Sequence, residues 1–212
     1  MREDDCDPSK LRGRTEAFLD DPGVHPMLRA LWQPRMMEAI DFIGRKMAEG
    51  MGEGRRPALA EVEGRAHLSG VELRGRVDRL DRCADGTLAI VDYKTGQPPS
   101  KKAIEEGFAL QMGLLGAIAA RGGFPDLSGV PGLLEYWSLA RKKGESGFVV
   151  DAAERTKRTA AEFVQRAEEL FGAAAAKWLT GSAPFTAKLH PAYAPYGDYD
   201  QLMRLEEWYG RE

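Results

Sequence analysis

Apolar and polar residues alternate from Val71 to Asp81, the pattern of a strand with one buried face. A second segment, Thr87 to Tyr93, is short, apolar and β-branched, as strand segments often are. Ala84-Asp85-Gly86 lies between them and has the composition of a tight turn. The pattern therefore predicts a β-hairpin that turns near Asp85.

The rest of the chain predicts helices and further strands around this hairpin. Leu59 to Leu68 has the pattern of a strand that Ser69-Gly70 joins to the hairpin, and Gly132 to Ala140 that of another. Apolar residues recur at helical spacing in three segments, 27–47 with a kink at Pro34, 101–120, and 151–179 with Asp151 as cap. This order predicts an α/β (α+β) fold with a mixed central sheet flanked by helices.

The size of the chain indicates one domain. A sequence of 212 residues with 43% hydrophobic content can bury one substantial core. We expect residues 1–22 to form a flexible N-terminal segment and residues 23–212 to form a single domain. The aromatic tail from Pro184 onward is expected to wrap over the core, with a partner surface as the alternative.

Composition excludes several classes of protein. The net charge of −3 means that any nucleic-acid binding must come from local basic patches, such as Lys101-Lys102, Arg141 to Lys143, and Arg155 with Lys157-Arg158. Two cysteines, Cys6 and Cys83, cannot build a disulfide framework or an iron–sulfur cluster. Since the sequence shows no signal peptide or membrane span, we expect a cytoplasmic protein with no membrane partner.

Two acids on the predicted hairpin suggest a metal site. A turn near Asp85 places Asp78 opposite Asp92, with Cβ atoms roughly 4.5–5.5 Å apart. Two carboxylates at that separation repel each other unless a cation lies between them, and Mg²⁺ or Mn²⁺ prefers such oxygen ligands. Lys94 shares the face of Asp92, because side chains alternate along a strand. This arrangement predicts a metal-dependent phosphodiesterase site.

The preceding strand offers a third acid. A turn at Ser69-Gly70 places Glu61 opposite Asp78 and Glu63 opposite Arg76. We predict Glu61 as a further catalytic or metal-binding acid and the second pair as structural. A single β-bulge would shift this register by one residue.

These motifs resemble a known family. Gly75-Arg-Val-Asp-Arg-Leu-Asp81, Val91-Asp-Tyr-Lys-Thr-Gly96 and Gln111 are similar to the RecB-like branch of the PD-(D/E)XK nucleases, and within it to the C-terminal nuclease domains of AddB subunits. The resemblance covers most of the chain from about Gly23, including Leu189-His-Pro191 and Tyr196 to Leu202 in the tail.

The resemblance implies a restriction-endonuclease-like core and a set of site residues. Asp78, Asp92 and the backbone carbonyl of Tyr93 would hold Mg²⁺ or Mn²⁺, with Glu61 as the further acid. Lys94 would position or activate the attacking water, and Gln111 would lie near the substrate strand. It also implies DNA, as single-stranded ends, for substrate, and an AddA-type helicase subunit as partner in double-strand break repair.

The chain departs from this family pattern in three places. The first motif helix with its histidine ligand has no counterpart, and His25, His67 and His190 stand outside that context. Leu115 occupies the position of a tyrosine, and the iron–sulfur cysteines of some relatives are absent. Two alternatives to an enzyme therefore remain. One is a catalytically silent module that binds DNA or a helicase subunit, and the other is a structural protein in which Lys94 neutralises both acids.

Overall fold

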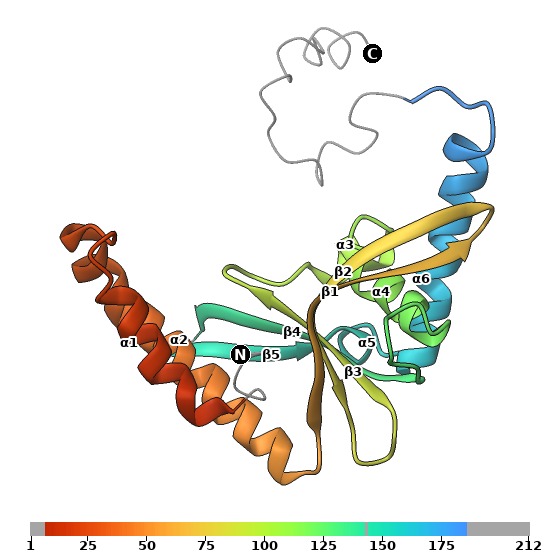
Figure 1. The fold of residues 1–212 in the computed structure, drawn as a ribbon. Coiled ribbons are helices and arrows are strands. Elements are labelled where there is room, and N and C mark those ends of the chain that lie inside the picture. Colours follow the sequence, from red (N-terminus) through yellow and green to blue (C-terminus); the bar gives the residue numbers. More distant parts are fainter. Residues whose placement is uncertain (1–6, 143, 186–212) are drawn as a thin grey trace, which may run out of the picture.

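The structure is a computed structural model that describes residues 7–142 and 144–185 (Figure 1). It opens with a 3₁₀ turn η2 (Pro8–Lys10), helix α1 (Leu11–Leu19) and the long helix α2 (Pro26–Gly52). The elements that follow are β1 (Arg56–Leu68), β2 (Val71–Arg82), β3 (Leu88–Lys94), α3 (Lys101–Glu105), α4 (Gln111–Ala120), β4 (Pro131–Lys142), β5 (Glu145–Asp151), α5 (Ala152–Arg155), α6 (Ala160–Ala174) and the π-helical turn η3 (Ala175–Leu179).

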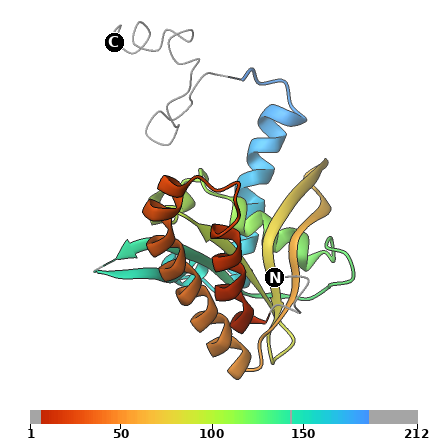
Figure 2. The same ribbon diagram turned by 60° about the vertical axis from the view of Figure 1, so that its left-hand side comes forward.

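The five strands form one mixed sheet in the order β1-β2-β3-β4-β5. Strands β3 and β4 run parallel, and the other neighbours are antiparallel. The α1–α2 hairpin covers one face of the sheet, and α4 with α6 covers the other (Figures 1 and 2). The mixed α/β fold predicted from the sequence is confirmed.

Central strand β3 contributes to both cores because its side chains alternate between the two faces. Leu88 and Ile90 belong to the larger core with α4 and α6, whereas Val91 and Tyr93 pack in the core under α2. This alternation places Asp92 on the α4 side, at the end of an apolar row. A polar site is thus anchored in the most buried strand of the sheet.

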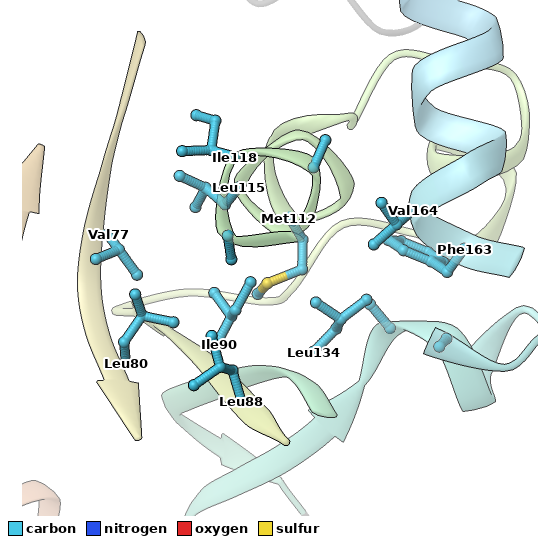
Figure 3. Packing of buried hydrophobic residues seen from close by; sticks show 14 of the residues in the cluster. Val77, Leu80, Leu88, Ile90, Met112, Leu115, Ile118, Leu134, Phe163 and Val164 are labelled. Carbon is cyan, nitrogen blue, oxygen red and sulfur yellow. The ribbon is translucent and has the colours of Figure 1, made fainter. Parts of the chain in front are cut away.

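Helix α4 lies between the sheet and α6 (Figure 3). Met112, Leu115 and Ile118 point toward the sheet, while Gly113 and Gly116 leave room for α6. A Cβ atom on Gly113 would lie 2.3 Å from Cβ of Ala167, and one on Gly116 would lie 2.5 Å from Cγ2 of Val164. Close packing of α6 therefore fixes the position of α4.

Helix α2 packs on the opposite face through its C-terminal half. Phe42, Ile43 and Met47 join Val91 and Trp137 in the second core. Pro34 lies inside α2 and does not end it. The N-terminal half extends beyond the sheet (Figure 1), and Met27, Leu31 and Trp32 are exposed. The apolar residues of the first turns of this helix are therefore not part of the core, although they continue its helical spacing.

The N-terminal segment differs from the predicted flexible stretch 1–22. Helix α1 occupies 11–19, and its residues Leu11, Thr15 and Leu19 are buried. Their spacing of four residues puts them on one helix face, and Arg12 forms an ion pair with Asp41 of α2 at 2.8 Å. A polar composition with a short buried stripe was enough to form a docked helix.

Two predicted helices are interrupted. The segment 101–120 divides into α3 and α4 at Gly107, whose φ of +84° takes the left-handed backbone that glycine allows. Asp151 caps only the short α5, and α6 begins anew at Thr159, which forms a capping box with Glu162. Strand β5, which the sequence reading missed, pairs with β4.

The expected packing of the aromatic tail and the expected lack of a membrane span are the last two predictions to compare with the structure. The tail segments from residue 186 onward lie outside the described residues. Within 7–142 and 144–185, each helix is too short or too polar to cross a membrane.

Candidate metal site at the end of the central hairpin

The β2–β3 hairpin has the register that the sequence predicts. Arg79 pairs with Val91 and Leu80 with Ile90, so the same register continued by one residue places Asp78 across from Asp92. At that point the backbone N–H of Tyr93 donates a hydrogen bond to Oδ2 of Asp78 at 2.8 Å. A side-chain oxygen of β2 thus binds the backbone of β3 at the start of the candidate site.

Asp92, Lys94 and Gln111 form a connected polar group. Asp92 is only 3% exposed, and Nζ of Lys94 lies 2.8 Å from its Oδ2. Nε2 of Gln111 donates to Oδ1 of Asp92 at 3.1 Å, and Nζ of Lys94 donates to Oε1 of Gln111 at 3.4 Å. Gln111 is the first residue of α4, so its side chain reaches the end of β3. The structure brings these predicted site residues together.

Burial raises the pKa of Asp92 above its ordinary value. The nearby Lys94 cation opposes this shift, and the negative charge of Asp78 adds to it. Oδ2 of Asp92 is buried and accepts no hydrogen bond of good geometry from the described residues, although Lys94 is its close ion-pair partner. The carboxylate therefore has unused capacity to bind a cation.

Glu61 is not brought to the other acids. The β1–β2 pairing passes from Ala60–Arg79 to Val62–Val77, as the predicted register requires, but Glu61 itself has a φ of +54°. Its exposed carboxylate forms an ion pair with Nη2 of Arg76 at 2.9 Å. The alternation of apolar and polar residues predicts that Glu61 lies in a strand. It carries no information on whether the backbone of a single residue takes the left-handed conformation.

The predicted pair of Glu63 and Arg76 is confirmed as a strand register but not as an ion pair. Glu63 instead lies 2.9 Å from Nη2 of Arg65, its neighbour on the same side of β1. This ion pair and the Glu61–Arg76 pair are both exposed, and exposed ion pairs contribute little to stability.

The chain also matches a known family over nearly its whole length. Residues 2–193 fit the sequence profile of the PD-(D/E)XK nuclease superfamily. The chain belongs to that superfamily. Members of the PD-(D/E)XK superfamily are generally metal-dependent nucleases, and the Asp78, Asp92-Tyr-Lys94 arrangement has the residue types that give the superfamily its name.

Other comparisons are weaker for this PD-(D/E)XK domain. Among similar solved structures is one titled "Crystal structure of SSO0001", with 15% identity, 78% of this chain and 70% of that chain covered, and a TM-score of 0.29. No curated protein matches the chain. The family assignment therefore rests on the profile match.

The donor atoms of this PD-(D/E)XK site fit a hard divalent cation. Within the described part of the chain, no three His, Cys, Asp or Glu side chains lie together as a metal-binding group. Mg²⁺ commonly uses one or two carboxylates and keeps several waters, whereas a structural zinc site needs four protein ligands. Asp78 and Asp92 offer carboxylate oxygens, the ligand type that Mg²⁺ and Mn²⁺ prefer.

Two of the residues behind the family departures, Leu115 and His25, have structural roles. Leu115 is buried in the core against β2, where a Cβ atom on Gly75 would lie 2.8 Å from its Cδ2. Nδ1 of His25 accepts a hydrogen bond from Met27 N at 3.2 Å and caps α2. His67 is exposed on β1, and His190 lies outside the described residues.

Sequence analysis missed a buried ionic network on the opposite face of the hairpin. Arg79 is only 2% exposed, and its Nε lies 2.9 Å from Oδ1 of Asp81. Arg55 joins the network, with Nε 2.6 Å from Oδ2 of Asp81 and Nη2 2.9 Å from Glu135. The sequence signal was available in the Arg-Leu-Asp run of the hairpin, whose charges alternate with buried apolar residues.

This network contacts the candidate metal site through Tyr93. Arg79 donates a hydrogen bond to the Tyr93 hydroxyl, and the ring of Tyr93 packs edge-on against Trp137. Burial raises the pKa of Tyr93 to about 12, so the hydroxyl stays protonated. Since the backbone N–H of Tyr93 binds Asp78, side-chain contacts on one face of β3 help to fix an acid at the other.

Proposed function

We propose that this chain is a metal-dependent DNA nuclease domain with exonuclease activity, working in the cytoplasm. The observation that carries the proposal is the buried Asp92, joined to Lys94 and Gln111 beside Asp78 at the end of β3. Membership of the PD-(D/E)XK superfamily supports the same reaction.

Each residue of this group has a distinct proposed task. Asp78 and Asp92 would hold Mg²⁺ or Mn²⁺, which when bound lowers the pKa of water and offsets charge on the phosphate. Lys94 reaches the surface end of β3 and would orient the attacking water or stabilise the developing negative charge. Gln111 holds Asp92 and Lys94 in fixed positions through its two hydrogen bonds.

Glu61 has no direct part in this arrangement. For Glu61 to act at the site, its ion pair with Arg76 must break and its side chain must turn toward Asp78. We therefore propose Asp78, Asp92, Lys94 and Gln111 as the working set.

The cellular role proposed here is double-strand break repair as part of a helicase–nuclease, with an AddA-type helicase subunit as partner. This part of the proposal is supported by the resemblance of the hairpin motifs and Gln111 to AddB nuclease domains. Single-stranded DNA ends are the substrate that such a helicase would deliver.

Cleavage of labelled single-stranded DNA in Mg²⁺ or Mn²⁺ tests the proposal. Asp92→Ala and Lys94→Ala should each lower the rate by roughly 100-fold or more, as loss of a charge-stabilising group does at other active sites. Asp41→Ala and Lys177→Ala change exposed charges away from the hairpin and serve as matched controls. Equal cleavage by all five proteins would discard the assignment.

A second candidate is a catalytically silent domain that binds DNA or a helicase subunit. It is favoured by the absence of a third acidic or histidine ligand within the described residues. Calorimetric titration with Mn²⁺ separates the two candidates. Metal binding that requires Asp78 and Asp92 without turnover supports the silent domain, whereas turnover excludes it. No metal uptake at all supports a purely structural ion pair between Asp92 and Lys94.

A further inference from the structure

A groove of about 750 Å³ runs between the N-terminal half of α2 and the sheet. Leu31, Trp32 and Arg35 of α2 form one wall, and Thr95, Leu139 and Arg141 form the other. The groove is separate from the small cavity under the C-terminal half of α2, where that helix contacts the sheet directly. The groove is therefore a feature of the part of α2 that extends beyond the second core.

Two contacts define where the groove ends. Gly147 of β5 lets Phe42 approach closely, since a Cβ atom there would lie 2.3 Å from the Phe42 ring. One turn earlier, Glu38 binds Nη2 of Arg141 at 2.8 Å and accepts a hydrogen bond from Ser146. Beyond Glu38, toward the start of α2, the helix and the strands separate.

The groove borders the end of β3 on the α2 face of the sheet, whereas the side chains of Asp92 and Lys94 lie on the α4 face. Lys94 pairs with Ser138 in the parallel β3–β4 register, and the groove residues Thr95 and Leu139 come directly after these two. Ser138 also donates a hydrogen bond to the carbonyl of Gly96 at 2.8 Å, which holds the chain after Thr95 against β4. A ligand lying in the groove would thus contact Thr95 from the α2 side of the sheet.

The groove combines an aromatic surface with positive charge. Trp32 is 61% exposed and Leu31 is 65% exposed, an unusual state for such large apolar side chains. Arg35 lies one helical turn from Trp32 on the same face, and its positive charge, like that of Arg141, acts on Glu38. With Arg35 and Arg141 against Glu38, the charged side chains of the lining favour an anionic ligand.

Single-stranded nucleic acid fits this chemistry better than a duplex. Bases of a single strand stack on aromatic side chains while cationic side chains contact the phosphates. In a duplex the base faces are already stacked on one another, so Trp32 could not reach them. The positive balance of the lining also favours a phosphate backbone over a neutral protein surface.

We propose that this groove binds single-stranded DNA, with a base stacked on Trp32 and a phosphate at Arg35. A role of the groove in cleavage would rest on the nuclease function proposed above. Strand binding itself does not, because it requires neither a metal ion nor turnover.

Fluorescence anisotropy of a labelled oligo-dT strand in chelator tests the groove separately from the reaction. Trp32→Ala should weaken binding by roughly 5- to 100-fold, the loss expected for one base–aromatic stack, and Trp32→Phe should retain most of the affinity. Arg35→Ala should weaken binding and reduce its salt dependence. Matched controls are Trp178→Ala in η3 and Arg166→Ala in α6, which lie on other elements.

The outcomes distinguish the groove from the nuclease assignment. Weaker binding by both groove variants, with both controls unchanged, supports the groove whether or not the chain cleaves DNA. Unchanged DNA affinity in Trp32→Ala and Arg35→Ala overturns it, including the case in which the groove takes a protein, and leaves the metal site in place. Equal or tighter binding of duplex, or no DNA binding by the unaltered chain, also overturns it.

Discussion

At the scale of single residues, the candidate site is built around Asp92, a carboxylate whose charged form is destabilised by burial. Asp92 continues the apolar row of Leu88 and Ile90, and its burial disfavours the charged form. Lys94 compensates in part, and its position two residues further along β3 follows from strand alternation alone. A bound divalent cation would complete the compensation that Lys94 begins.

The pKa of Asp92 should respond to removal of Lys94. In metal-free protein we expect the carboxyl to titrate above its ordinary value of 3.8, and Lys94→Met to raise the midpoint further because the nearby cation is lost. Carbon-13 NMR of the labelled aspartate carboxyl groups measures both midpoints. Lys102→Met is the control, and a midpoint in Lys94→Met at or below that of the unaltered chain would contradict the assigned roles.

At the scale of elements, the sequence predicts features that depend on neighbouring residues. It does not predict features that depend on packing between distant segments. The hairpin register followed from alternation and a turn at Asp85, both of which act over a few residues. The proximity of Asp78, Asp92 and Lys94 could therefore be predicted from the hairpin pattern, whereas Gln111 was expected only from the resemblance to RecB-like nucleases. The twist at Glu61, the break at Gly107 and the pairing of β5 depend on distant contacts or on backbone angles that several residue types can adopt.

Helix α4 shows how packing positions the site, because its first residue is Gln111. Gly113→Ala should lower the free energy of unfolding by about 1–3 kcal/mol, since the added methyl would lie 2.3 Å from Ala167. Gly13→Ala in α1 is the matched control, because its Cβ would meet nothing within 4 Å, and it should raise stability by about 0.5–1 kcal/mol. Urea unfolding measures both changes. If the two variants changed stability in the same direction, the close contact between α4 and α6 would be wrong.

At the scale of the whole molecule, β3 contributes to two cores, and each core positions different residues of the candidate site. The core under α2 contains the ionic network of Arg79, Asp81 and Arg55, and it holds Tyr93 from one side. The larger core holds Asp92 and, through α4, Gln111 from the other side. Occupation of the metal site should therefore stabilise the entire domain rather than the hairpin alone.

Thermal unfolding with and without Mg²⁺ tests this linkage. A metal ion that binds only the folded state should add about 2.7 kcal/mol when its concentration is one hundred times its Kd, and Tm should rise. Asp92→Asn should abolish that rise.

Without metal, the Asp92→Asn variant should equal or exceed the stability of the unaltered chain at neutral pH. The sign follows from the raised pKa of Asp92. The folded state binds this proton more tightly than the unfolded chain, so stability falls as pH rises from the ordinary value of 3.8 through the raised pKa, and a permanently neutral amide avoids the loss. Asp41→Asn should leave the metal-dependent rise intact, and a full rise in Asp92→Asn would place the bound metal elsewhere.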